Sequence, residues 1–189
     1  MVSKFLALTI PIVLLTSEAR SELLGENLLF SPPNGFSLAS QLDNRRSLIS
    51  EWVPATQSIH NWSELITVQI FRGLRKDPED FLRSIRQGFV IACSGTSFKE
   101  FPKHLTNGYS VSVLIVECPK NPKTQKPETT VFRVINGRDA LYSVQHAWRS
   151  LPTSSELNRE LETLSGVTVC DTREPDHPCP NLSRLPPGQ

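Results

Sequence analysis

Residues 129–148 read TTVFRVINGRDALYSVQHAW, two strand-like runs that flank the pair Asn136-Gly137. An Asn-Gly pair between such runs is the strongest short-range signal for a β-hairpin, because both residues tolerate the positive φ that a two-residue turn requires. The sequence therefore predicts an antiparallel hairpin made of residues 129–135 and 138–148. Further strands that follow one another along the chain are then expected to extend the same sheet.

Several such strands are predicted on the N-terminal side of the hairpin. Residues 109–118 read YSVSVLIVEC, and residues 65–71 read LITVQIF. In the second run Ile66, Val68 and Ile70 fall on one face and Thr67 and Gln69 on the other, which is the period-two pattern of a half-buried strand. Shorter strands are expected within 22–30, 36–42 and 48–53.

A helix is predicted from Asp77 to about Cys93. Asp77 can accept backbone hydrogen bonds as the N-cap, and Pro78 suits the first helical position. One face carries an apolar stripe made of Phe81, Leu82, Ile85 and Phe89.

A second helix is predicted after Leu151. Thr153 and Glu156 have the spacing of a capping box, and Gly166 is a suitable C-terminal stop. Its buried stripe is expected to consist of Leu157, Leu161 and Leu164.

This order of elements predicts an α+β fold, a mostly antiparallel β-sheet with two helices packed on it. We expect a single domain over residues 20–174. Residues 175–189 are rich in proline, which opposes regular structure, so a C-terminal tail is expected there.

Residues 1–19 have the three parts of a secretory signal peptide. Lys4 precedes the apolar run 5–15, and Ser17 and Ala19 supply the small residues of a cleavage site. The alternative is a membrane anchor, but the run is shorter than the roughly 20 residues that a span needs. We therefore expect a cleaved signal, a periplasmic or secreted protein, and no integral membrane segment after cleavage.

The chain has four cysteines, Cys93, Cys118, Cys170 and Cys179. In an exported protein an even number suggests disulfides, and three connectivities are possible for two bonds. We prefer the sequence-local pairing, Cys93–Cys118 and Cys170–Cys179. The alternative for the second pair is a metal site with His177, but the spacing matches no standard zinc signature.

The charge balance argues against nucleic-acid binding. Twenty Lys and Arg face nineteen Asp and Glu, a net charge of +1, whereas a general polyanion binder has a strong basic excess. The lysines of residues 119–127 are interpreted as part of a solvated loop.

The sequence contains no recognisable catalytic or cofactor motif. Neither a Gly-x-Ser-x-Gly elbow nor a phosphate-binding glycine loop is present, and no two histidines have the spacing of a metal pair. His146 is interpreted as a core histidine on a strand. The acidic pair Glu79 and Asp80 is explained by the helix dipole, and Glu160 and Glu162 by a solvated helix face.

His60 and Trp62 are the candidates for a partner surface. They lie in an expected loop before a strand, and exposed tryptophans are common in binding hot spots. The alternative is that the tryptophans, including Trp52 and Trp148, cap the core.

Three stretches carry a resemblance: 61–69 (NWSELITVQ), 137–145 (GRDALYSVQ), and the segments VCDTR and HPCP within 169–180. Together they resemble a family of uncharacterised exported proteins of Gram-negative bacteria. The resemblance implies export and supports the Cys170–Cys179 pairing. The order of elements is also similar to the PsbP-like fold of photosystem accessory proteins and a Ran-binding import factor, which implies a non-catalytic binding or assembly module.

The sequence therefore favours an exported, non-catalytic domain that binds a protein partner or an envelope component and needs no cofactor. Two alternatives remain open. One is a hydrolase whose site is assembled from loops, with Ser94, His104 and Asp171 as candidates. The other is a binder of small apolar ligands held between sheet and helix.

Overall fold

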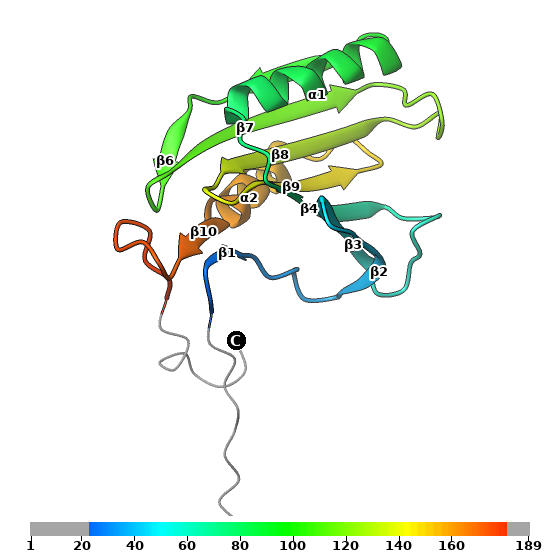
Figure 1. Cartoon of the computed structure of the whole chain (residues 1–189). Helices are drawn as coiled ribbons and strands as arrows, with labels where there is room; N and C mark the ends of the chain where they lie inside the picture. Colours follow the sequence, from blue (N-terminus) through cyan, green and yellow to red (C-terminus); the bar gives the residue numbers. More distant parts are fainter. Residues whose placement is uncertain (1–22, 181–189) are drawn as a thin grey trace, which may run out of the picture. The chain divides into compact units, whose positions relative to one another are not determined.

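The computed structural model describes residues 23–180, so the expected signal peptide and residues 181–189 of the expected tail lie outside it. Figure 1 shows the order of the elements along the chain. They are β1 (Glu26–Leu29), β2 (Phe36–Asp43), β3 (Ser47–Pro54), β4 (Glu64–Arg72), α1 (Pro78–Ala92), β5 (Ser97–Glu100), β6 (His104–Thr106), β7 (Tyr109–Cys118), β8 (Glu128–Asn136), β9 (Ala140–Trp148), α2 (Ser154–Ser165) and β10 (Thr168–Asp171).

One antiparallel sheet forms the centre of the domain. Its strand order is β2-β3-β4-β9-β8-β7-β5, with β6 also paired to β7. The remaining strands, β1 and β10, pair with each other in a separate two-stranded ribbon. The α+β class with a mostly antiparallel sheet is therefore confirmed.

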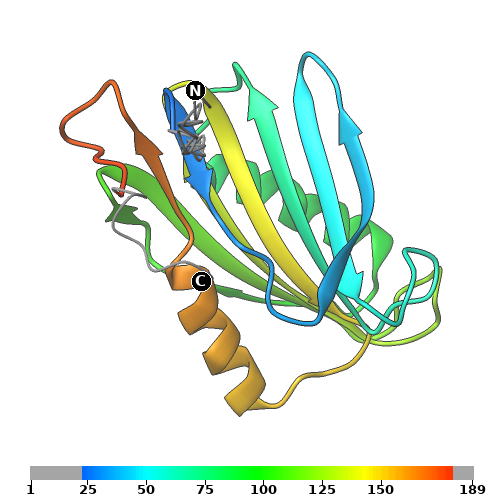
Figure 2. The ribbon, with the colours of Figure 1, turned by 90° about the horizontal axis from the view of Figure 1, so that it is seen from below.

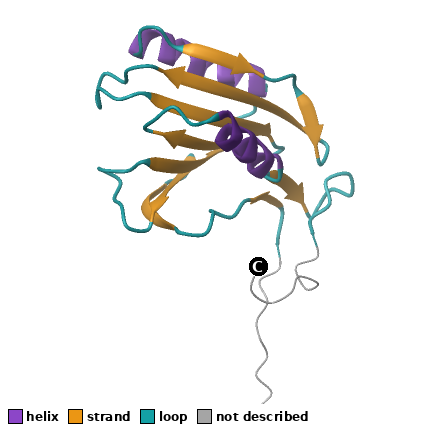
Figure 3. Ribbon diagram, turned by 180° about the vertical axis from the view of Figure 1, so that it is seen from behind, coloured by secondary structure: helices purple, strands orange, loops and turns teal. Residues whose placement is uncertain are grey.

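The two helices lie on opposite faces of the sheet (Figures 2 and 3). On one face α1 packs through Leu82 against a core that includes Leu114 and Phe132. On the other face α2 and the β1–β10 ribbon cover a core that includes Val113, Val131 and their neighbours. Both faces of β7 and β8 are thus buried, which explains why these strands have apolar residues at nearly every position.

The predicted hairpin is confirmed as β8–β9, but its predicted turn is wrong. Asn136 pairs with Leu141, so the loop is longer than two residues. Neither Asn136 nor Gly137 has a positive φ. Glycine is favoured at 137 for space, because an added Cβ would overlap the Glu26 carboxylate and lie 2.7 Å from the Tyr142 ring.

Both helix starts agree with the sequence. The Asp77 side chain accepts a hydrogen bond from the Glu79 amide at 2.9 Å. Thr153 and Glu156 form the full capping box. The second helix ends before Gly166, but Gly166 has a φ of −74°, so it does not use the left-handed conformation that favours glycine.

Both disulfides of the sequence-local pairing are present. Cys93 at the end of α1 is joined to Cys118 at the end of β7. Cys170 on β10 is joined to Cys179. The second bond closes a loop that continues past the expected domain limit at 174, and the His177 ring stacks on Tyr109 at 4.1 Å between centroids. Residues 175–180 therefore lie against the domain.

Candidate functional site

α1 covers only part of its face of the sheet. It lies along β7 and β8 and reaches β4 at Phe71, which packs against Phe81 with ring centroids 5.5 Å apart. Within residues 23–180, no helix lies over the same face of β3 and β2. A groove of about 730 Å³ results, which we call the α1 groove. Its helical wall consists of Ser84, Ile85, Gly88, Phe89 and Ala92, and its floor and far wall of Ser40, Leu42, Ile49, Glu51, Trp62, Leu65, Thr67, Gln69, Glu128, Thr130, Phe132, Gln145 and Ala147.

A row of polar side chains crosses the floor of the α1 groove. Glu51 on β3 pairs with Thr67 on β4, and Thr67 pairs with Gln145 on β9. Gln69 lies two residues along β4 on the same face. Thr67 and Gln69 are the polar face of the alternating pattern that predicted β4. This face lines the groove, beyond the part of the sheet that α1 covers.

The polar groups of this row are not used inside the protein. Within residues 23–180, no side-chain hydrogen bond involves Glu51, Thr67, Gln69 or Gln145. Thr67 as a whole is only 5% exposed, but its unpaired hydroxyl is not fully enclosed by the protein. These groups therefore point to the open space of the groove, where a ligand can reach them.

The walls of the groove are apolar and aromatic. Phe89 of α1 packs edge-on against Phe132 of the floor, with ring centroids 6.1 Å apart. Trp62 lies at another part of the wall, half-buried, with the Arg149 guanidinium 3.9 Å from the centre of its ring. Of the two candidates for a partner surface, Trp62 lines this groove and His60 lies exposed in the loop before it.

Two residues that line the groove carry carboxylate side chains, Glu51 and Glu128. Burial raises the pKa of Glu128, against the effects of a hydrogen bond from Asn121 and of the charge on Arg149. Glu51 and Glu128 are three strands apart across the sheet and four residues apart along it. Their Cα atoms are therefore separated by roughly 20 Å. Glycosidic hydrolysis needs two carboxyl groups about 5–10 Å apart, so this pair does not suit it.

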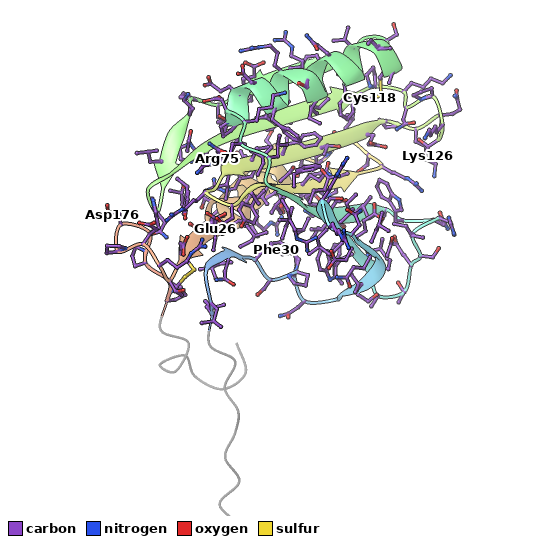
Figure 4. The ribbon with its side chains drawn as sticks, in the orientation of Figure 1. Glu26, Phe30, Arg75, Cys118, Lys126 and Asp176 are labelled. Atoms are coloured by element: carbon purple, nitrogen blue, oxygen red, sulfur yellow. A yellow bond between two sulfur atoms is a disulfide. The ribbon has the colours of Figure 1, made fainter. Side chains whose placement is uncertain are left out.

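A second cavity of about 580 Å³ lies between β1 and the other face of the sheet. It is lined by aromatic side chains that include Phe30, Trp52 and Tyr142. The charges at its rim already have partners: Arg72 contacts Asp43 at 2.7 Å, and the Glu26 carboxylate accepts a hydrogen bond from the Tyr142 hydroxyl at 2.8 Å. Glu26 and Phe30 are labelled on this side of the molecule in Figure 4.

His146 is a core residue, as its place on a strand suggests. It lies between two carboxylates, with Nε2 3.1 Å from Glu64 and Nδ1 2.9 Å from Glu160, and its ring stacks on Trp148. Neither cavity includes it. The interpretation of Glu160 as part of a solvated helix face is wrong, because its side chain is only 11% exposed and faces His146, whereas Glu162 is exposed.

The hydrolase candidates are not brought together. Ser94 follows Cys93 and so lies by the Cys118 end of β7, whereas His104 pairs with Val111 near the other end. The two positions are roughly 20 Å apart along the strand. The carboxylate of Asp171 is held by Arg173, with contacts of 2.8 and 2.6 Å.

The metal alternative also finds no support among the residues of known position. Cys170 and Cys179 are joined as a disulfide, and His177 Nδ1 contacts the Asn107 carbonyl at 2.8 Å. No group of three His, Cys, Asp or Glu side chains in residues 23–180 is arranged to hold a metal ion.

Comparison with known proteins gives no assignment: no protein-family model matches this chain, and no curated protein is significantly similar to it. Within residues 23–180, neither helix is long and apolar enough to cross a membrane.

Proposed function

We propose that the protein is an exported, non-catalytic domain that binds a protein partner or an envelope component through the α1 groove. The observation that carries the proposal is the row Glu51–Thr67–Gln145, whose polar groups have no partner within the described part of the chain. Binding sites typically combine apolar walls with a few convergent polar groups, and the volume of this groove falls in their usual range.

The covalent frame supports the exported part of the proposal. Both disulfides are compatible with an oxidising compartment, where such bonds form and persist. The chemistry of the groove supports the non-catalytic part, since its lining offers no histidine, cysteine or lysine beside its two distant carboxylates.

A small apolar ligand is the second candidate function, and the aromatic cavity behind β1 favours it. Phe30 and Trp52 form a ring pair there with centroids 5.7 Å apart. The α1 groove suits such a ligand less well, because an apolar molecule would leave Thr67 and the two glutamines without hydrogen-bond partners.

Gly88 offers a direct test of the groove. It lies in the middle of α1 on the groove wall, and a Cβ added there meets no atom within 4 Å. Gly88→Trp is therefore expected to fill the groove without disturbing the core, with Gly88→Ala as the matched control.

The measurement is partner capture from periplasm or culture medium by the immobilised wild type and by both variants. We expect one set of captured components to be lost with Gly88→Trp and kept with Gly88→Ala. If Gly88→Trp retains every component that the wild type captures, the groove is not the binding site.

A further inference from the structure

We infer that the α1 groove binds an extended basic polypeptide segment, with a lysine or arginine side chain on Glu51 and main-chain amides along Thr67, Gln69 and Gln145. This inference rests on the proposed function and specifies the chemistry of the occupant.

The charge of the groove selects the sign of the ligand. Its lining includes two carboxylates and no lysine, arginine or histidine. Glu128 already has Asn121 and the nearby Arg149, whereas Glu51 forms no ion pair with any residue from 23 to 180. Two cations contact the lining, Arg149 over the Trp62 ring and Lys76 at the Ser84 hydroxyl, but neither forms an ion pair with Glu51. A ligand cation would therefore complement Glu51.

The hydrogen-bonding groups suit a polypeptide main chain. The carboxamides of Gln69 and Gln145 each offer donors and an acceptor, and the hydroxyl of Thr67 offers both. A peptide main chain also presents a donor and an acceptor at each residue, so it can satisfy all three side chains. A free amine would engage Glu51 and leave the glutamines unpaired.

The extent and the walls of the groove suit an extended segment. The polar row spans β3, β4 and β9, about 10 Å across the sheet. Side chains of an extended peptide alternate between two sides, so basic residues can face Glu51 while apolar residues contact Ile85, Phe89 and the rest of the wall.

The test uses fluorescence anisotropy with two labelled synthetic peptides of about seven residues. One alternates lysine with valine, and the other has glutamate in place of every lysine. For the full-length mature protein we expect saturable binding of the basic peptide, at least tenfold tighter than the acidic one. Glu51→Gln is expected to weaken the basic peptide about tenfold. The control Glu162→Gln makes the same charge change on an exposed residue of α2 and is expected to have no effect.

Four results would overturn the inference: no binding of the basic peptide, equal binding of both peptides, unchanged binding in Glu51→Gln, or displacement of the peptide by a simple amine. Butylamine serves as a competitor, and if it displaces the peptide at the peptide's own concentration, the ligand is a free amine and not a polypeptide. If Gly88→Trp abolishes binding of both peptides while Glu51→Gln changes neither, the groove stands as the binding site and only its preference for a basic segment fails.

Discussion

His146 connects three elements through its two ring nitrogens. From β9 it contacts Glu64 of β4 and Glu160 of α2, and its ring lies against Trp148 and Phe36. Burial opposes its charged form, but the two carboxylates outweigh that effect and raise the pKa of His146 above its usual 6.5. The hydrogen bond from His146 is the main cause that lowers the pKa of Glu64.

The signs of these shifts set a pH window for stability. A raised histidine pKa contributes stability that is complete below about 6.5 and is lost as the pH rises through the folded pKa. The lowered pKa of Glu64 contributes stability that is complete above about pH 4.5 and is lost as the pH falls through the folded pKa. The cluster is therefore expected to stabilise the fold most between about 4.5 and 6.5.

His146→Gln is expected to reduce the free energy of unfolding by about 3 kcal/mol at pH 6, because it leaves two carboxylates without their cation. The wild type is expected to lose stability between pH 6 and 8 as His146 loses its proton, and the variant is expected to lack most of this loss. Urea titrations of both proteins across this pH range measure the effect. A wild type and a variant with the same pH dependence would contradict this role of His146.

Glu160 is an acidic residue of α2 whose side chain is mostly buried. It falls three residues after Leu157 and four before Leu164, on the buried stripe of the second helix. An acidic residue on that stripe needs a buried cation, and the one opposite comes from His146, fourteen residues earlier on another element. Spacing alone could have raised the question, but only the contact of α2 with β9 supplies the partner.

Between elements, the β8–β9 turn depends on β1. The Glu26 carboxylate accepts hydrogen bonds from the Asp139 amide at 3.0 Å and from the Tyr142 hydroxyl at 2.8 Å. Burial is the largest cause that raises the pKa of Tyr142, and the hydrogen bond with Glu26 adds to it. Gly137 lets the carboxylate approach this closely, since a Cβ would overlap it.

Gly137→Ala is expected to destabilise the fold by about 2 kcal/mol, because the methyl group would overlap Glu26 and the Tyr142 ring. Thermal and denaturant unfolding measure the change. In a double-mutant cycle the penalty should fall when Glu26→Ala is already present. If Gly137→Ala costs as much stability with Glu26→Ala as without it, the methyl group does not act through overlap with Glu26.

Gly88→Ala in α1 is expected to stabilise the fold, in contrast to Gly137→Ala. Glycine inside a helix costs about 0.5–1 kcal/mol relative to alanine, and the site has room for the methyl group. We expect the free energy of unfolding to rise by that amount in a denaturant titration. A decrease would show that the space beside Gly88 is filled in solution.

Across the whole domain, the disulfide between Cys93 and Cys118 fixes α1 to β7 and so defines one wall of the groove. Closing its 25-residue separation is expected to stabilise the fold by about 3 kcal/mol through the unfolded chain. Cys93→Ala with Cys118→Ala should lose that amount in a guanidinium titration.

Thiol titration provides the control for this prediction. No cysteine is free, so the unfolded, non-reduced wild type should show no reactive thiol and the reduced protein should show all four. The double variant should show two after reduction and none before it. A free thiol in the non-reduced wild type would contradict the paired arrangement.

Strong local signals made most elements predictable. Alternation in residues 65–71, the capping box at Thr153 and the Asp77-Pro78 start each determine structure within a few residues. β5 and β6 are not predictable from the sequence, because runs of four and three residues with exposed Lys99, His104 and Leu105 show no periodicity. They are strands because β7 offers its edge to them.

The sequence by itself determined the α+β class, the hairpin and the two helices, since each follows from patterns within a short stretch of chain. It indicated the pairing of the cysteines as well, because each disulfide joins the two cysteines that are nearest in sequence. It also identified Thr67 and Gln69 as the polar side of a strand. Only the tertiary structure decided that this side faces a groove, because that depends on where α1 stops covering the sheet. The alignment of Glu51, Thr67 and Gln145 likewise comes from the register of three strands that are distant in sequence.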